Sequence, residues 1–235
     1  MLSIVIPALN EEKYIRRLLE SVKKQGISDY EVIVADAGSS DKTVKIAKSY
    51  KCKIVKGGLP ACGRNNGAAA ARGDLILFLD ADCFLPGNCL KKSLAEYRKR
   101  KLNAATFTLL PDEKKGLNQL LLNLFYNWPM IMLEQILPHG AMGIFMDKKL
   151  FFKLNGFDET VKLAEDHDLV RRAKRIARFG VIRASSIFVS DRRFEKDGWA
   201  KTGFKFLFCE LHMIFLGPVR TDIFRYRFNH YSKRR

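Results

Sequence analysis

The sequence lacks the cysteine spacings that mark a disulfide framework or a structural zinc site. Its five cysteines are odd in number, and no two of them form a C-x-x-C pair. The four histidines show no ligand-like spacing either. These absences favour a reducing compartment and exclude a small, disulfide-stapled secreted domain.

Long apolar runs are also missing. Near the N-terminus only residues 2–7 are mostly apolar, and an acidic pair follows soon after. This apolar run is too short for a signal peptide. The longest uncharged stretch, 116–133, contains three asparagines, a glutamine and a proline, so we expect a half-buried or interfacial helix there and no membrane span. We therefore expect a cytoplasmic protein, peripheral at the inner face of the membrane if it meets lipid.

Acidic residues are scarce relative to basic ones. The 235 residues include 42 Lys plus Arg against 25 Asp plus Glu, a formal net charge of +17. Such a balance favours anionic partners, namely nucleic acid, phosphorylated ligands or an anionic membrane surface. With 47% apolar residues the chain is globular, and its length suits one large domain or one domain with an appendage.

Short apolar runs alternate with helical patterns in the first half of the chain. Strands are predicted at 2–7, 30–35, 53–55 and 75–79. Between them, helices are predicted from Asn10, from Ser40 or Asp41, and over 64–72. This alternation predicts an α/β fold with a doubly wound, mostly parallel sheet and flanking helices.

Two carboxylates follow the buried strand 75–79. Asp80 and Asp82 stand where that strand ends, and ligands of open α/β sheets bind outside the carboxyl ends of the strands. Both side chains could reach one divalent cation and its bound phosphates. The alternative is a solvated turn in which one of the two acids caps the next helix.

Several sequence blocks together resemble a known family. These blocks are residues 3–12 (SIVIPALNEE), 32–41 (VIVADAGSSD), 63–67 (GRNNG), 80–82 (DAD), 143–149 (GIFMDKK), 155–159 (NGFDE) and 165–171 (EDHDLVR). In order and spacing they resemble the family 2 glycosyltransferases, which have the GT-A fold and are inverting, nucleotide-sugar-dependent enzymes. The resemblance covers about residues 1–184.

The resemblance implies roles for the matching residues. The nucleotide sugar would be bound by Pro7, Ala8, Asn10, Glu11, Asp36, Arg64, Asp80 and Ala81. Asp80 and Asp82 would hold Mg²⁺ or Mn²⁺, and Asp166 would be the catalytic base. Relatives often close an arginine over the donor diphosphate, and Arg192 or Arg193 would be that residue.

Local patterns offer simpler interpretations of some of these residues. Acids at 165–168 followed by bases at 171–178 are what a helix dipole favours, so Asp166 and Asp168 could be helix-start residues. Asp36 could be a turn residue, and Arg64 could face solvent. The register of the family blocks favours the base role for Asp166, whereas Asp168 stays a structural cap or a partner of the site.

The predicted organisation is a catalytic domain over 1–190 followed by a basic, aromatic-rich appendage over 191–235. Within the domain, 1–110 would bind the nucleotide sugar and 111–190 would form the acceptor side. The appendage carries 11 basic and five acidic residues around an apolar stretch, which suits either an anionic membrane surface or a protein contact.

The predicted function is metal-dependent sugar transfer from a UDP-type or GDP-type donor to a hydroxyl or phosphate acceptor, lipid-linked acceptors included. Two alternatives stay open. One is a nucleotidyltransferase on a similar sheet, although residues 7–12 lack the glycine-rich loop expected there. The other is a basic nucleic-acid-binding protein, although no binding motif is recognised and no nucleic acid is expected.

Overall fold

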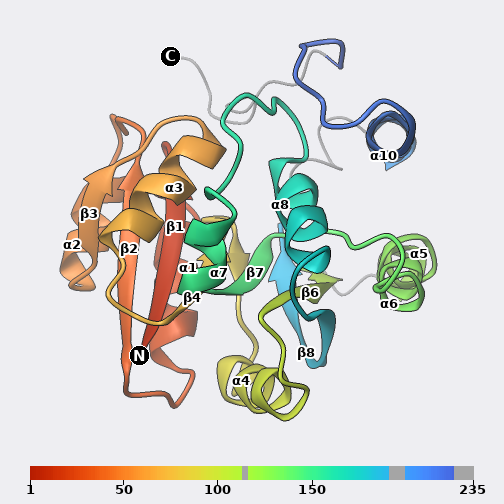
Figure 1. The fold of residues 1–235 in the computed structure, drawn as a ribbon. Helices are drawn as coiled ribbons and strands as arrows, with labels where there is room; N and C mark the ends of the chain where they lie inside the picture. Colours follow the sequence, from red (N-terminus) through yellow and green to blue (C-terminus); the bar gives the residue numbers. More distant parts are fainter. Residues whose placement is uncertain (113–115, 191–198, 225–235) are drawn as a thin grey trace.

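A computed structural model of the chain describes residues 1–112, 116–190 and 199–224, except for the side chains of 117, 118, 199–203 and 206 (Figure 1). Its centre is one mixed sheet with the strand order β3-β2-β1-β4-β7-β6-β8-β5. The strands are β1 (Leu2–Ala8), β2 (Tyr30–Asp36), β3 (Lys53–Lys56), β4 (Leu75–Leu79), β5 (Cys83–Phe84), β6 (Ala104–Pro111), β7 (Gly143–Asp147) and β8 (Phe179–Val189). The helices are α1 (Ile15–Lys23), α2 (Thr43–Ser49), α3 (Pro60–Ala70), α4 (Cys89–Lys99), α5 (Gly116–Leu122), the π-helical turn η1 (Asn123–Asn127), α6 (Trp128–Met132), α7 (Lys148–Lys153), α8 (Glu165–Lys174) and α10 (Trp199–Phe215).

The N-terminal half of the sheet is parallel, as predicted. β1 pairs with β2 and β4, and β2 pairs with β3, each in parallel. The register runs from Leu2 opposite Tyr30 to Ala8 opposite Asp36, so β1 and β2 end at the same level. The carboxyl ends of these strands therefore form one edge of the sheet.

The second half of the sheet mixes directions, which the sequence did not predict. β7 lies antiparallel between β4 and β6, whereas β6 and β8 are parallel. The chain travels from β6 to β7 through the outer helices α5, η1 and α6, and it returns to the sheet in the opposite direction (Figure 1). The predicted α/β class is confirmed, with a parallel half and a mixed half.

Helices cover both faces of the sheet because neighbouring strand residues point to opposite sides. Ile4 and Ile6 pack with α1, α2 and α4 in one core, whereas Val5 and Ile33 pack with α3, α7 and α8 in the other. Two such layers explain why the central strands are apolar without alternation.

Three helices begin at residues other than those predicted. α2 begins at Thr43 with Lys42 at the N-cap position, and not after Ser40 or Asp41. α1 begins at Ile15, not at Asn10, because Asn10 has a left-handed backbone (φ 56°) and the chain turns before the helix can start. α3 begins at Pro60, not at Arg64, because proline is pre-organised for a first helical position.

The uncharged stretch 116–133 forms an outer helical segment, α5, η1 and α6. Asn127 is its buried polar residue: its amide accepts from the Leu109 N–H at 2.9 Å and donates to the Leu109 carbonyl at 2.8 Å. The segment is thus attached to β6 through a main-chain-like pair of hydrogen bonds. Among the residues that the structure describes, no helix is long and apolar enough to span a bilayer.

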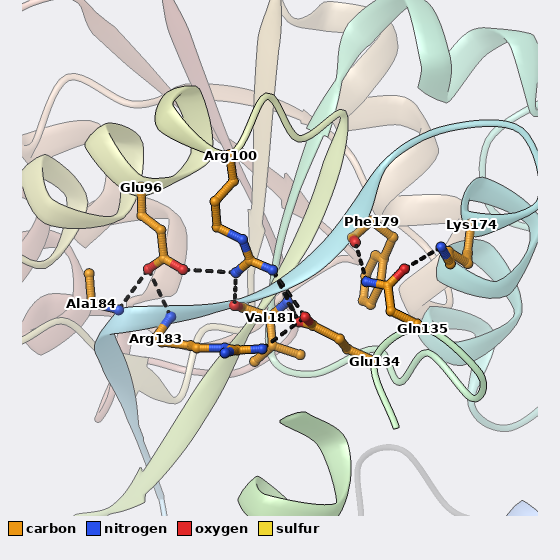
Figure 2. Close-up of polar contacts among 9 residues, drawn as sticks. All are labelled: Glu96, Arg100, Glu134, Gln135, Lys174, Phe179, Val181, Arg183 and Ala184. Atoms are coloured by element: carbon orange, nitrogen blue, oxygen red, sulfur yellow. Dashed lines mark hydrogen bonds and ion pairs between the residues drawn. The ribbon is translucent and has the colours of Figure 1, made fainter. Parts of the chain in front are cut away.

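An ion network holds the end of this outer segment on the sheet (Figure 2). The buried Glu134 accepts from Arg183 Nη2 at 2.8 Å, from Arg100 Nη2 at 3.1 Å and from the Val181 N–H at 2.8 Å. On the other side of Arg100, Glu96 accepts from Arg100 Nη1 at 2.9 Å. The network connects α4, β8 and the chain after α6.

The helix α10 packs on the segment that precedes α8. Cys209 and Met213 form a small core with Leu163 and Val219, and the Lys162 N–H donates to the Val219 carbonyl at 2.7 Å. The predicted boundary at 190/191 borders residues 191–198, which lie outside the described part of the chain.

Candidate functional site

Three sequence-predicted site residues meet at the carboxyl edge of the parallel strands. Ala8 ends β1, Asp36 ends β2 opposite Ala8, and Asp80 directly follows β4. The Ala37 N–H donates to the Ala8 carbonyl at 2.9 Å, which keeps the two loops together beyond the sheet. Pro7, half-buried, precedes Ala8 on the same strand.

The loop after β1 is fastened to the loop after β2. The Asn10 N–H donates to Ser39 Oγ at 2.9 Å, and Asn10 Oδ1 accepts from the Ser40 N–H at 2.9 Å. The Glu11 N–H donates to Thr43 Oγ1 at 2.8 Å. Asn10 and Glu11 therefore shape the rim of the edge, whatever they contribute to a ligand.

Asp36 has one satisfied oxygen and one free one. Its Oδ2 accepts from the Gly38 and Ser39 N–H groups, both at 3.0 Å, so the side chain is fixed by its own turn. Its Oδ1 is buried and has no hydrogen-bond partner. A buried acceptor left unpaired costs about 1–3 kcal/mol, so this oxygen is suited to receive a donor from a ligand.

A buried guanidinium joins Asp80 to the first turn of α8. Arg64 Nη2 donates to Asp80 Oδ1 at 2.6 Å, and Arg64 Nη1 donates to Glu165 Oε1 at 2.6 Å. Burial raises the pKa of Asp80, with the Asp82 charge adding to that and the Arg64 charge opposing it. The pKa of Glu165 is raised in the same way: burial and the Asp166 charge raise it, and the Arg64 charge opposes them. Arg64 therefore spans the distance between the strand tip and α8 instead of facing solvent.

The group at the strand tip fits a divalent cation by its chemistry. Ala81 is buried, whereas Asp80 and Asp82 are half-buried and close enough for the Asp82 charge to act on Asp80. Carboxylate oxygens are the ligands preferred by Mg²⁺ and Mn²⁺. A cation would also relieve the repulsion between these two acids.

Asp166 lies in the first turn of α8, beside Glu165. Its Oδ1 accepts from the His167 N–H at 2.9 Å. The loop before β7 passes very close, because a Cβ on Gly140 would lie 2.5 Å from the Asp166 carbonyl carbon. Only glycine fits there, and this contact holds the Asp166 backbone against that loop.

Two other family-like blocks interlock within the fold. Asn65 donates to the Phe157 carbonyl at 3.0 Å and accepts from the Phe157 N–H at 2.9 Å. Asp168 accepts from Arg172 Nε at 2.8 Å, and Arg172 in turn donates to the Leu154 and Gly156 carbonyls. These contacts of Asp168 are those of a structural residue, which is one of the two roles predicted for it. Arg192 and Arg193 lie outside the described residues.

Sequence reasoning missed two features near Asp166. One is Glu165 as the partner of Arg64, for which local sequence offered only a helix-dipole explanation. The other is the approach of His139, His167 and Glu210 to one another, for which no sequence spacing gave a signal.

The candidate site thus lies where the GT-A fold requires it, at the carboxyl edge of the parallel strands of an open α/β sheet. The chain belongs to a family described as Glycosyl transferase family 2, whose profile matches residues 3–157. This membership confirms the predicted enzyme class and favours it over the nucleotidyltransferase and nucleic-acid alternatives.

Individual proteins similar to this chain are also glycosyltransferases by name. The chain is 30% identical over 183 residues to an uncharacterized glycosyltransferase of Haemophilus influenzae, covering 72% of this chain and 60% of that protein. A Staphylococcus aureus TarS structure, residues 1–349 with UDP-GlcNAc, has a TM-score of 0.66 at 25% identity, covering 81% of this chain and 58% of that one. The fold is also similar to the mannosyltransferase PcManGT of Pyrobaculum calidifontis with GDP-Man and Mn²⁺, with a TM-score of 0.63 at 17% identity over 80% and 56% of the two chains. The chain thus spans less than two thirds of each of these proteins.

Proposed function

We propose that the chain is an inverting, divalent-metal-dependent glycosyltransferase that moves a sugar from a nucleoside diphosphate to a hydroxyl or phosphate acceptor. The observation that carries this proposal is the Arg64 bridge, which joins Asp80 at the strand tip to Glu165, the neighbour of Asp166. One buried group thereby couples the candidate donor side to the candidate base. Relatives solved with UDP-GlcNAc or with GDP-Man and Mn²⁺ support the donor class and the metal.

The proposed donor site assigns the nucleobase to Asp36 and the diphosphate to the strand tip. The unpaired Asp36 Oδ1 would accept from a ring N–H of a uracil or guanine base. Asp80 and Asp82 would hold the cation, and when bound, Mg²⁺ or Mn²⁺ stabilises the charge that develops on the leaving diphosphate. Pro7, Ala8, Asn10, Glu11, Arg64 and Ala81 would line the same edge.

Asp166 would act as the base for the acceptor. As the acceptor oxygen attacks the anomeric carbon, its proton passes to an Asp166 carboxylate oxygen, and the bond from that carbon to the diphosphate oxygen breaks. Attack opposite the leaving group inverts the anomeric configuration. Glu165 would position this side chain indirectly, because its bond to Arg64 fixes the first turn of α8.

A thermal-shift panel tests the donor site. UDP, GDP, CDP and dTDP sugars are added with and without Mn²⁺ to the chain and to Asp82→Asn. A Mn²⁺-dependent rise in melting temperature with one base, lost in the variant, is the expected result. A chain that no nucleotide stabilises would overturn the donor assignment.

We also propose peripheral binding to an anionic membrane, which would suit a lipid-linked acceptor. Large apolar side chains are exposed in two places. Phe125 (72%) and Met132 (81%) lie on the outer segment with Ile136 (82%) just after it, and Phe215 (77%) and Leu216 (76%) lie at the end of α10. Exposed apolar side chains together with a net charge of +17 are what a contact with an anionic lipid surface would use.

Vesicle flotation tests the membrane proposal. Binding to phosphatidylserine-containing vesicles should exceed binding to neutral ones, and Phe125→Ser should weaken it. The matched control is Phe152→Ser, which changes an exposed phenylalanine on α7. Equal flotation of the unmodified chain, Phe125→Ser and Phe152→Ser would count against a lipid contact at the outer segment.

A further inference from the structure

Two histidines and a glutamate from three separate segments converge beside Asp166. His139 lies in the loop before β7, His167 on α8 and Glu210 on α10. One ligand atom from each lies within 4.8 Å of the others. The two imidazole rings meet edge to face, with their centroids 4.9 Å apart.

Each of the two histidine–glutamate separations is close to that between ligands of a tetrahedral metal ion. Two atoms that each lie about 2.0–2.1 Å from such an ion are about 3.4 Å apart. His167 Nδ1 lies 3.3 Å from Glu210 Oε2, and His139 Nε2 lies 3.4 Å from Glu210 Oε1. Each Glu210 oxygen thus faces one imidazole nitrogen, and one atom from each of the three side chains already lies within 4.8 Å of the others, so a turn of the carboxylate would place one ion among them.

The hydrogen bonds of His139 leave its outer nitrogen free to ligate. His139 Nδ1 lies 2.9 Å from the Leu137 carbonyl, an acceptor, so Nδ1 carries the proton. In the neutral ring Nε2 then presents a lone pair to a carboxylate oxygen, which is unfavourable without a cation between them. Burial lowers the pKa of His139, which favours that neutral ring.

Arg171 orients the carboxylate without occupying both of its oxygens. Its Nη2 donates to Glu210 Oε1, which leaves Oε2 facing His167. Although burial opposes the charge, a hydrogen bond from His167 Nδ1 helps to lower the pKa of Glu210 to about 2, so the group is ionised; a bound ion would take the place of that Nδ1 proton. Hydrogen-bonded carboxylate ligands and carbonyl-fastened histidine ligands are both usual in protein metal sites.

We propose that His139, His167 and Glu210 form a binding site for a divalent metal ion of the zinc class. Two imidazoles and one carboxylate suit Zn²⁺ or Co²⁺, whereas Mg²⁺ prefers oxygen ligands. This site is separate from the Asp80 and Asp82 carboxylates. The ion would fasten α10 to α8 and to the loop that carries Gly140, and would thereby fix the first turn of α8 around Asp166.

Metal titration of the full chain tests this site. All proteins carry Asp82→Asn, so that the donor-site ion is not counted, and no nucleotide is present. Co²⁺ is followed by its visible absorption, and Zn²⁺ by competition with a coloured chelator. The expected result is one tightly bound ion per chain.

His139→Asn is the decisive variant. Asparagine keeps an amide N–H where Nδ1 donates to Leu137, but it has no atom at the position of Nε2. We expect at least about 100-fold weaker binding with an unchanged metal-free melting temperature. Glu210→Gln, added as a second ligand variant, should weaken binding as well.

His212→Asn is the matched control, because His212 is on α10 and its Nδ1 faces the Gly217 carbonyl at 3.1 Å. It should leave the affinity unchanged. The proposal would be overturned if the Asp82→Asn chain bound neither Co²⁺ nor Zn²⁺. It would also be overturned if adding His139→Asn to that chain left the metal affinity unchanged. The nucleotide panel can succeed or fail independently, since it depends on Asp82 and not on these three residues.

Discussion

Two buried ion networks of this molecule use the same residue types for different ends. In the network of Figure 2, the carboxylates of Glu134 and Glu96 both accept main-chain N–H groups: Val181 donates to Glu134, and Arg183 and Ala184 donate to Glu96. At the carboxyl edge, Arg64 bonds one oxygen each of Asp80 and Glu165.

The difference indicates which acids hold the fold and which are available to a ligand. Glu134 and Glu96 each accept main-chain N–H groups with one oxygen and arginine side chains with the other. Both oxygens are thus satisfied within the fold, so the contribution of these two acids is structural. Asp36 shows the opposite condition, because its Oδ1 is buried with no partner. An acid left partly unsatisfied at a sheet edge is a better candidate for function than a buried acid as such.

The largest expected effect lies on the functional side of this comparison. Asp166→Asn should lower turnover by about 100-fold or more, since an amide cannot take the acceptor proton, while donor affinity and melting temperature stay nearly normal. Steady-state rates with the donor identified by thermal shift measure it.

Asp168→Asn, two residues further along the same helix, is the control for Asp166→Asn. Asp168→Asn should lower the melting temperature, because it weakens the ion pair with Arg172. A near wild-type rate for Asp166→Asn would break the assignment of that residue as the base.

A middle-sized effect is expected in the structural network. Glu134→Gln should lower the free energy of unfolding by about 2 kcal/mol, because a neutral amide weakens two Arg contacts and the contact from Val181. Denaturant unfolding measures it, with the exposed Glu20→Gln on α1 as a control. Nucleotide affinity should not change, and a change would mean that the two networks are coupled.

The smallest expected effect concerns Glu31, an acid satisfied by Ser3 and Arg72 on the parallel half of the sheet. Burial opposes its charge, but the Arg72 N–H and the Ser3 hydroxyl lower its pKa below the ordinary 4.5. Its stabilisation is therefore present above pH 4.5 and is lost as pH falls through the lowered value. Glu31→Gln should cost less than about 1 kcal/mol at pH 7, and the difference should vanish in acid. A difference that persists in acid would mean that packing, not charge, is lost.

The sequence predicted the parallel half of the sheet well, because its strands are short apolar runs punctuated by turn residues. It did not predict the antiparallel β7, because strand direction depends on the path of α5 to α6 and not on the residues 143–147 themselves. The starts of α1 and α3 differ from the predicted ones because backbone conformation sets them: Asn10 is left-handed, and Pro60 favours the first helical position.

Candidate site residues could be proposed from the sequence where they follow strands, and less readily where helices bring them together. Asp36 and Asp80 are found by reading strand ends. The Arg64 contact with Glu165 spans 101 positions, and the contact of His167 with Glu210 spans 43. Such pairs carry no local periodicity, so only the packing of α3, α8 and α10 reveals them.

The π-helical turn Asn123–Asn127 makes the outer segment sensitive to its length more than to its composition. A π-helical turn holds an extra residue, and in an α-helix each residue rotates the following side chains by about 100°. Deleting one residue here would turn the Asn127 amide away from Leu109, or rotate the exposed apolar face away from its present direction. Natural variation in this segment should therefore tolerate exchange of one apolar residue for another far better than insertion or deletion of a single residue.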